Sequence, residues 1–208
     1  MRLLILTAVL AGLLTGGPAR AQEGPVVSFG ASTLGATLEM GYRVSPDFGL
    51  RGIAGFGNMD FATTFSGAPV QGNANIGGYG VLGDIYLGGG VRLSAGAVAP
   101  GYGAEMSITG DITIDGNTVN NVDIAASLSS TNQFAPMLAI GYEKTYRNNW
   151  GISADIGAMY TGGFSLSATD NSAQITQADL DAELADTNAE LGQIIILPYI
   201  KLGVSFQF

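Results

Sequence analysis

The feature that most constrains this chain is a repeated alternation of apolar residues with small or polar ones, in segments of about ten residues. Successive side chains of a β-strand point to opposite faces, so each such segment predicts a strand with one apolar face. The alternation is clearest over 34–44, 150–160 and 196–208. In the first of these segments the apolar positions are Leu34, Ala36, Leu38, Met40, Tyr42 and Val44.

The other face of these segments separates a soluble sheet from a membrane one. In a soluble sheet the polar face contacts water and usually carries many Lys and Glu residues. Here that face is rich in glycine and carries only four acids and four bases: Glu39, Arg43, Arg51, Asp84, Arg92, Glu143, Asp155 and Lys201. Such a set suits the crowded interior of a small barrel whose apolar face meets lipid. A closed barrel also satisfies every backbone N–H and C=O group internally. The sequence therefore predicts an all-β, transmembrane, antiparallel up-and-down barrel.

Turns and parity predict eight strands. Tight connections are expected at 45–47, 88–90 and 147–149, where Pro, Gly and Asn cluster. They separate strands near 34–44, 48–60, 75–87, 91–104, 133–144, 149–161 and 194–208. Bacterial barrels have even strand numbers, so we add Val26 to Ser32. The rival eighth strand, 164–168, would place the short turns outside, the reverse of the usual asymmetry. The longer segments 61–74, 105–132 and 162–193 are predicted to be outer loops.

The N-terminus predicts export. Met1-Arg2 is followed by an apolar run from Leu3 to Leu14 and by small residues around Ala21, the pattern of a signal peptide over 1–21. The run is shorter than the roughly 20 apolar residues of a spanning helix, which disfavours an uncleaved anchor. Cleavage leaves 208 − 21 = 187 residues, 22–208, as the barrel domain. It also removes two arginines, so the net charge becomes −9 − 2 = −11.

Two stretches carry a family resemblance. They are the hairpin Gly41-Tyr-Arg-Val-Ser-Pro-Asp-Phe-Gly-Leu-Arg51 and the end Ile200-Lys-Leu-Gly-Val-Ser-Phe-Gln-Phe208. With the signal peptide, they resemble the small eight-stranded outer-membrane barrels of Gram-negative bacteria, the OmpA/OmpX/OmpW-like, porin-family type. The resemblance implies an outer-membrane location. It also implies that the alternate apolar residues at the C-terminus are the signal read by the barrel-assembly machinery: Ile200, Leu202, Val204, Phe206 and Phe208.

The last predicted loop departs from the strand pattern. Thr176 is a fair helix N-cap, with Asp179 three residues on. Leu180, Leu184 and Leu191 share one helical face, and Gly192 follows. We expect an amphipathic helix over 176–191, with its leucines packed over the barrel mouth or on neighbouring loops.

The interior charges are expected to form a plug, because an eight-stranded barrel is only wide enough for side chains to fill. Register arithmetic places Glu39 diagonal to Arg51, Asp84 diagonal to Arg92, and Lys201 within reach of Asp155. The alternative is a charged constriction in a narrow channel.

Composition excludes several functions. The chain has no histidine and no cysteine, which removes zinc centres, serine triads and thiol nucleophiles. Its 17 acidic residues against 8 basic ones disfavour nucleic acid. We expect no catalytic, cofactor-binding or metal-ligating residues and no enzymatic activity.

The leading hypothesis is a non-enzymatic barrel serving envelope integrity or surface interaction, with outer-membrane lipid and lipopolysaccharide as partners. Segments 105–132 and 162–193 carry acids and no base, which suggests divalent cations as weaker partners. Two alternatives remain. One is a narrow porin for small solutes or apolar molecules. The other is a soluble periplasmic lipid-binding barrel, whose apolar face would point inward.

Overall fold

A computed structural model of the chain describes residues 24–65, 67–114 and 117–208. The predicted signal peptide, 1–21, lies outside these residues. Eight antiparallel strands close into a barrel, which confirms the predicted fold class. They are β1 (Gly24–Ser32), β2 (Gly35–Ser45), β3 (Phe48–Phe65), β4 (Ala68–Gly88), β5 (Val91–Pro100), β8 (Ala135–Thr145), β9 (Trp150–Tyr160) and β11 (Ile196–Gln207).

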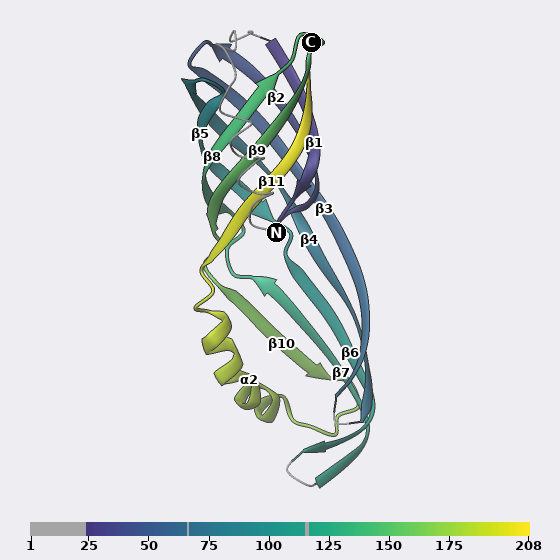
Figure 1. Ribbon diagram of the computed structural model, residues 1–208. Coiled ribbons are helices and arrows are strands. Elements are labelled where there is room, and N and C mark those ends of the chain that lie inside the picture. Colours follow the sequence, from purple (N-terminus) through teal and green to yellow (C-terminus); the bar gives the residue numbers. More distant parts are fainter. Residues whose placement is uncertain (1–23, 66, 115–116) are drawn as a thin grey trace, which may run out of the picture.

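The barrel closes through the pairing of the first and last strands. Around the barrel the order is β1-β2-β3-β4-β5-β8-β9-β11, and β11 pairs back onto β1 (Figure 1). Three short connections, β2–β3, β4–β5 and β8–β9, lie at the same end as Phe208, which we call the turn end. In the β4–β5 turn, Gly90 has φ +88°, and a Cβ there would lie 2.4 Å from the Glu143 carbonyl oxygen. The turn therefore requires glycine at this position.

The barrel has an apolar outside and a polar inside. Met40, Leu138 and Leu202 are each about two-thirds exposed on the outer surface (65%, 68% and 66%), whereas the charged residues at alternate positions point inward and are mostly buried. This arrangement is the opposite of the one that a soluble lipid-binding barrel requires. Leu34 departs from its predicted face, because it lies in the β1–β2 turn and folds into the interior, where it is fully buried.

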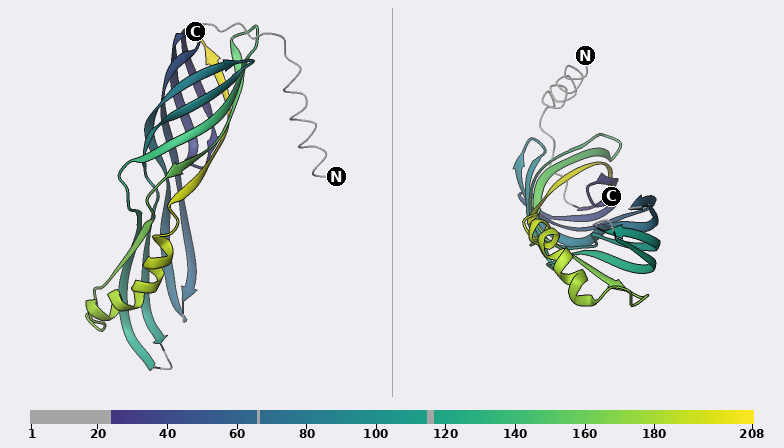
Figure 2. Two further views of the ribbon diagram at one scale, coloured as in Figure 1. Left: turned by 90° about the vertical axis from the view of Figure 1, so that its left-hand side faces the viewer. Right: turned by 90° about the horizontal axis from the view of Figure 1, so that it is seen from below.

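The three segments predicted as outer loops contain regular strands, which corrects the loop assignment. β3 and β4 continue past the barrel and pair as far as Phe65 and Ala68. β6 (Gly103–Ile114), β7 (Asn117–Ser130) and β10 (Phe164–Asp170) add to them, giving an outer sheet in the order β3-β4-β6-β7-β10 (Figures 1 and 2). The rejected segment 164–168 is therefore a strand, but it is not part of the barrel. We call this end of the molecule the sheet end.

The helix predicted over 176–191 is confirmed as α2 (Gln177–Leu191). The Thr176 hydroxyl accepts a hydrogen bond from the Asp179 amide, 3.3 Å away, and Gly192 follows the last turn. Leu184 packs against a buried cluster of the outer sheet that includes Ile124 and Ala168. The helix therefore lies along the outer sheet (Figure 1). Within the described ranges, no helix is long and apolar enough to span a bilayer.

Side-chain amides of α2 cover the free edge of β10. The Leu166 amide donates to Asn188 Oδ1 (2.7 Å), and Asn188 Nδ2 donates to the Leu166 carbonyl (2.9 Å). Gln177 Nε2 donates to the Ala168 carbonyl at 3.0 Å. An uncovered edge strand can pair with other chains, so these contacts protect the sheet as well as holding the helix.

Asn188→Ala is expected to loosen α2 from the sheet without affecting the barrel. The substitution removes two hydrogen bonds to Leu166, each worth about 1 kcal/mol, so exchange of the Leu166 amide should accelerate about tenfold or more. Thr187→Ala is the matched control, because Asn and Thr have similar helix propensities and no hydrogen bond of the Thr187 side chain is described. Hydrogen exchange in detergent micelles measures the effect; equal rates in both variants would contradict this role for Asn188.

Asp170 holds the connection from β10 to α2 in a pH-dependent way. Partial burial opposes ionisation of Asp170, but the Ser172 hydroxyl and the backbone amides of Ile175, Ser172 and Gln174 donate to its carboxylate and lower its pKa to about 2. Because the folded pKa is lower than the unfolded value, the stabilisation is fully present above about pH 4 and is lost as the pH falls through about 2.

We therefore expect the Asp170 carboxyl carbon to titrate with a midpoint near 2 in an NMR titration. Ser172→Ala removes one donor and should raise the midpoint. A midpoint near 4 in the unsubstituted chain would contradict the hydrogen-bonded connection.

Candidate functional site

Six strands bring charged side chains to one level inside the barrel. Each points inward because it lies on the inner phase of its strand: Glu39 on β2, Arg51 on β3, Asp84 on β4, Arg92 on β5, Asp155 on β9 and Lys201 on β11. All six are at least 95% buried. Pairing fixes their level, since Lys201 is directly opposite Asp155, and Arg51 is opposite Gly41, two residues from Glu39. We call this set, with Ser94 and Glu143, the charged layer.

Arg51 is the centre of the charged layer. Its Nη1 lies 3.0 Å from Glu39 Oε1 and 3.4 Å from Asp155 Oδ2, and its Nε lies 3.0 Å from Asp84 Oδ2. Its Nη2 donates to Asp84 Oδ1 (3.1 Å) and to Ser94 Oγ (3.0 Å). One guanidinium therefore joins three carboxylates from three strands, which uses the planar fork that lysine lacks.

Arg92 and Lys201 complete the network. Arg92 Nη2 lies 2.8 Å from Asp155 Oδ1, and its Nη1 lies 2.6 Å from Glu143 Oε2. Lys201 Nζ pairs with Glu39 and lies 3.5 Å from Asp155 Oδ2. Buried charges are tolerated only when they are paired and hydrogen-bonded, and these ion pairs meet that requirement.

The register confirms the predicted diagonal position of Asp84, but the side chain pairs elsewhere. Asp84 is diagonal to Arg92 in the register, as expected, but its carboxylate is directed to Arg51 and Ser94. Arg92 pairs instead with Asp155 and Glu143. The predicted proximities of Glu39 to Arg51 and of Asp155 to Lys201 are present in the structure.

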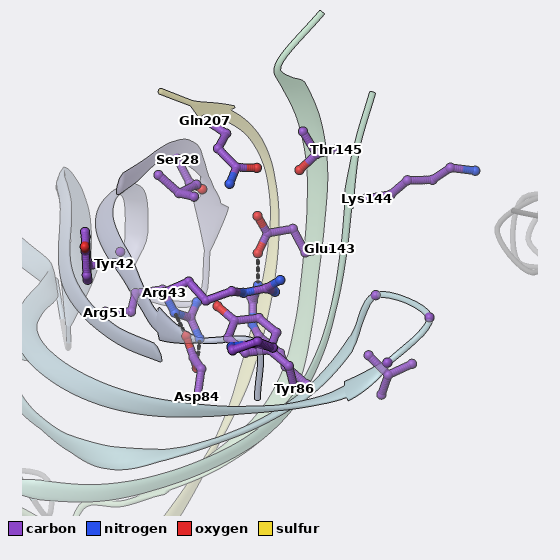
Figure 3. Close-up of a pocket in the computed structure, with 18 of the residues that line it drawn as sticks. Ser28, Tyr42, Arg43, Arg51, Asp84, Tyr86, Glu143, Lys144, Thr145 and Gln207 are labelled. Carbon is purple, nitrogen blue, oxygen red and sulfur yellow. Dashed lines mark hydrogen bonds and ion pairs between the residues drawn. The ribbon is translucent and has the colours of Figure 1, made fainter. Parts of the chain in front are cut away.

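A cavity of about 530 Å³ opens at the turn end and stops at the charged layer (Figure 3). Arg51 and Asp84 line its inner part. Nearer the rim, the Arg43 guanidinium lies flat over the Tyr86 ring, 3.5 Å from its centroid. Arg43 therefore belongs to the inward set, but it stands outside the network of ion pairs described above.

An apolar layer fills the barrel on the other side of the charged layer, toward the sheet end. Leu82 lies two residues from Asp84 on β4, and Tyr199 lies two residues from Lys201 on β11. Both are fully buried and belong to a cluster that also contains Leu34, Ile53, Val98, Ala135, Met137, Ala139 and Met159. The interior is thus occupied by two successive layers of side chains, one charged and one apolar.

The apolar layer and Ser94 were not predicted from the sequence. The signal of the apolar layer is a break in the alternation: Met159 and Tyr199 are large apolar residues on the phase assigned to the polar interior. Such breaks lie at the end of each strand that is nearer the sheet end, so together they indicate one apolar layer across the barrel. Four of the five C-terminal residues proposed as an assembly signal lie on the outward phase of β11, and the fifth, Phe208, directly follows the strand. Phe206 packs edge-on against Trp150 with ring centroids 5.3 Å apart.

The site offers no evident chemistry for a metal or cofactor. Among residues 24–65, 67–114 and 117–208, no three acidic side chains come together as ligands for an ion. The carboxylates of the charged layer are engaged by arginine and lysine, including Glu39, Asp84 and Glu143, which line the turn-end cavity.

Comparison with known proteins gives the fold. No family model matches the sequence, and no curated protein matches it. The solved structure of CarO2 from Acinetobacter baumannii is similar, with a TM-score of 0.60 and 24% identity over 90% of this chain and all (100%) of that chain. CarO from the same species gives 0.57 and 20% identity over 90% and 98% of the two chains. A major outer membrane protein from Thermus thermophilus gives 0.50 and 15% over 88% and 98%. The chain has the fold of outer-membrane β-barrels.

Arg51→Ala is expected to lower the free energy of unfolding by about 3–5 kcal/mol, because it leaves three buried carboxylates without their shared cation. Urea unfolding in phospholipid vesicles, followed by the heat-dependent gel shift of folded barrels, measures the loss. Arg147→Ala removes the same charge from an exposed turn and serves as the control. A loss below about 1 kcal/mol, the range of an exposed ion pair, would contradict a structural role for the network.

Proposed function

We propose that this chain is a non-enzymatic, integral outer-membrane barrel with a closed interior, and that it serves envelope integrity or surface interaction. It would reach the outer membrane of a Gram-negative bacterium after removal of residues 1–21. The alternate apolar residues ending at Phe208 would be read by the barrel-assembly machinery. The fold and the apolar outer surface of the barrel support this proposal, since exposed Met40, Leu138 and Leu202 are unfavourable in water and suited to lipid.

The proposed orientation puts the turn end in the periplasm and the sheet end outside the cell. Outer-membrane barrels have short periplasmic turns and long extracellular segments, and here the three short turns share one end. On the outer surface of β3 and β4, the aromatic residues Phe56 and Tyr79 lie nearer the turn end, and the exposed polar residues Asn58 and Asn75 lie nearer the sheet end. Aromatic residues favour the interface between lipid and water, so this level suits the outer rim of the membrane.

The two layers of buried side chains inside the barrel are the observation that carries the proposal. The turn-end cavity stops at Arg51 and Asp84, and beyond them Leu82, Met159 and Tyr199 are fully buried. A porin needs a continuous water path, and these two layers of buried side chains argue against one between the turn end and the sheet end. The outer sheet and α2 are then the parts exposed to the cell's surroundings, so surface interaction is assigned to them.

Membrane lipid and lipopolysaccharide are the proposed partners. Divalent cations are retained only as diffuse counter-ions of the acidic sheet end. The described acidic residues there are spread over β3, β6, β7, β10 and α2, and no group of three forms a coordination site among them.

Planar-bilayer recording of the refolded chain, 22–208, tests closure. We expect no discrete conductance steps from protein that shows the heat-dependent gel shift of a folded barrel, with an open porin as the positive control. Reproducible steps that change their ion selectivity in the Arg92→Gln variant would show a water path through the charged layer. The porin alternative would then replace this proposal.

A further inference from the structure

The outer sheet has two chemically different faces. On the face continuous with the outside of the barrel, residues paired directly across the five strands form two polar rows. The first row is Asp60, Asn73, Glu105, Ser127 and Ser167, and the second is Ala62, Gln71, Ser107, Ala125 and Thr169. On the opposite face lie Phe61, Met106 and Ala168, and Leu184 of α2 packs against the cluster that contains Ala168.

A shallow groove runs between the two polar rows. It has a volume of about 890 Å³ and is lined by all residues of both rows, with Phe61, Gly72, Met106 and Ala126 between them in the strands. It crosses five strands, so it is about 19 Å long at the usual strand spacing. Several linked sugar units would fit along it.

Part of the lining is already ordered by hydrogen bonds. Asn73 Nδ2 donates to Asp60 Oδ1 at 2.7 Å, and Asn58 Nδ2 donates to Asn73 Oδ1 at 2.9 Å. The hydroxyls of Ser127 and Ser167 lie 2.9 Å apart. Groups held in place before binding lose less conformational entropy when a ligand arrives.

The chemistry of the two rows favours one class of ligand. Apart from Ala62 and Ala125, their side chains are amides, hydroxyls and two carboxylates, and neither row contains Lys or Arg. Without a cation the groove does not favour phosphate or sulfate groups. Amide, hydroxyl and carboxylate groups supply the donors and acceptors that match sugar hydroxyls.

The position of the groove identifies the source of such sugars. It lies on the same side of β3 and β4 as the outward-facing Phe56 and Tyr79, and Asp60 follows Phe56 by four residues, about 13 Å along the strand. If the barrel occupies the outer membrane as proposed above, this is where the sugars of neighbouring lipopolysaccharide molecules begin.

We propose that the groove between the two polar rows of the outer sheet binds neutral sugars of the lipopolysaccharide that surrounds the barrel. This inference rests on the proposed membrane location and names the site through which the outer sheet contacts the envelope. It assigns the contact to Gln71, Glu105 and Ser107, whose exposed side chains line the groove.

The test is calorimetric titration of the refolded chain in detergent with the soluble core oligosaccharide released from lipopolysaccharide. We expect saturable binding that is about tenfold or more weaker in the double variant Gln71→Ala/Glu105→Ala, which loses two hydrogen-bonding groups. The double variant Gln174→Ala/Glu183→Ala makes the same two changes at exposed positions beyond the groove and should bind normally.

The inference would be overturned by no binding of the oligosaccharide, by equal loss in both double variants, or by equal binding of an unrelated neutral glucan. Binding to vesicles of lipid A alone as strong as to complete lipopolysaccharide would also overturn it, because the contact would then lie with phosphates or acyl chains. Membrane fractionation of cells keeps the two proposals apart. Recovery of the chain in the outer membrane without oligosaccharide binding removes the groove proposal alone, whereas recovery in the soluble fraction removes both.

Discussion

The closure of the sheet is the constraint on which the rest of this structure depends. A strand in lipid must pair both of its edges, and β11 meets that need by pairing with β1. Closing only eight strands leaves an interior as narrow as the side chains that fill it. A charge that points inward at the middle of the barrel is then removed from bulk water, so Arg51, Arg92 and Lys201 must find their carboxylates across the barrel.

Beyond the barrel the same strands respond to a different solvent. Along β3 the outward phase runs from Leu50 and Phe56 to Asn58 and Asp60, while the inward phase runs from Arg51 to Phe61. The period of two is unbroken, but the apolar and polar faces exchange places. This exchange follows because the outer surface leaves lipid for water, while the inner surface leaves the ion pairs for packing against other apolar residues and α2.

The barrel could be predicted from the sequence because most of its strands alternate apolar with small or polar residues, and three of its hairpins turn at Pro, Gly or Asn. Part of the charged layer could also be predicted, because Glu39 and Arg51 lie on two strands joined by a short turn, and a short turn fixes which residues pair. The outer sheet could not be predicted, because the exchange of apolar and polar faces within β3 looks in the sequence like the end of a strand. The choice of Asp84 between Arg51 and Arg92 also depends on side-chain directions through the barrel, which no spacing along the chain contains.

The distribution of charge along the barrel axis has a kinetic consequence. Ten acidic residues of the sheet end are described, on the outer sheet and α2, and from position 93 to 143 the sequence holds no base to offset them. In the proposed orientation these carboxylates must pass through the hydrocarbon during insertion, at about 2.5–3.5 kcal/mol for each charge at mid-bilayer. Spontaneous insertion is therefore expected to be slower than assisted insertion. The same barrier slows withdrawal of the acidic end, so it helps to keep the inserted orientation.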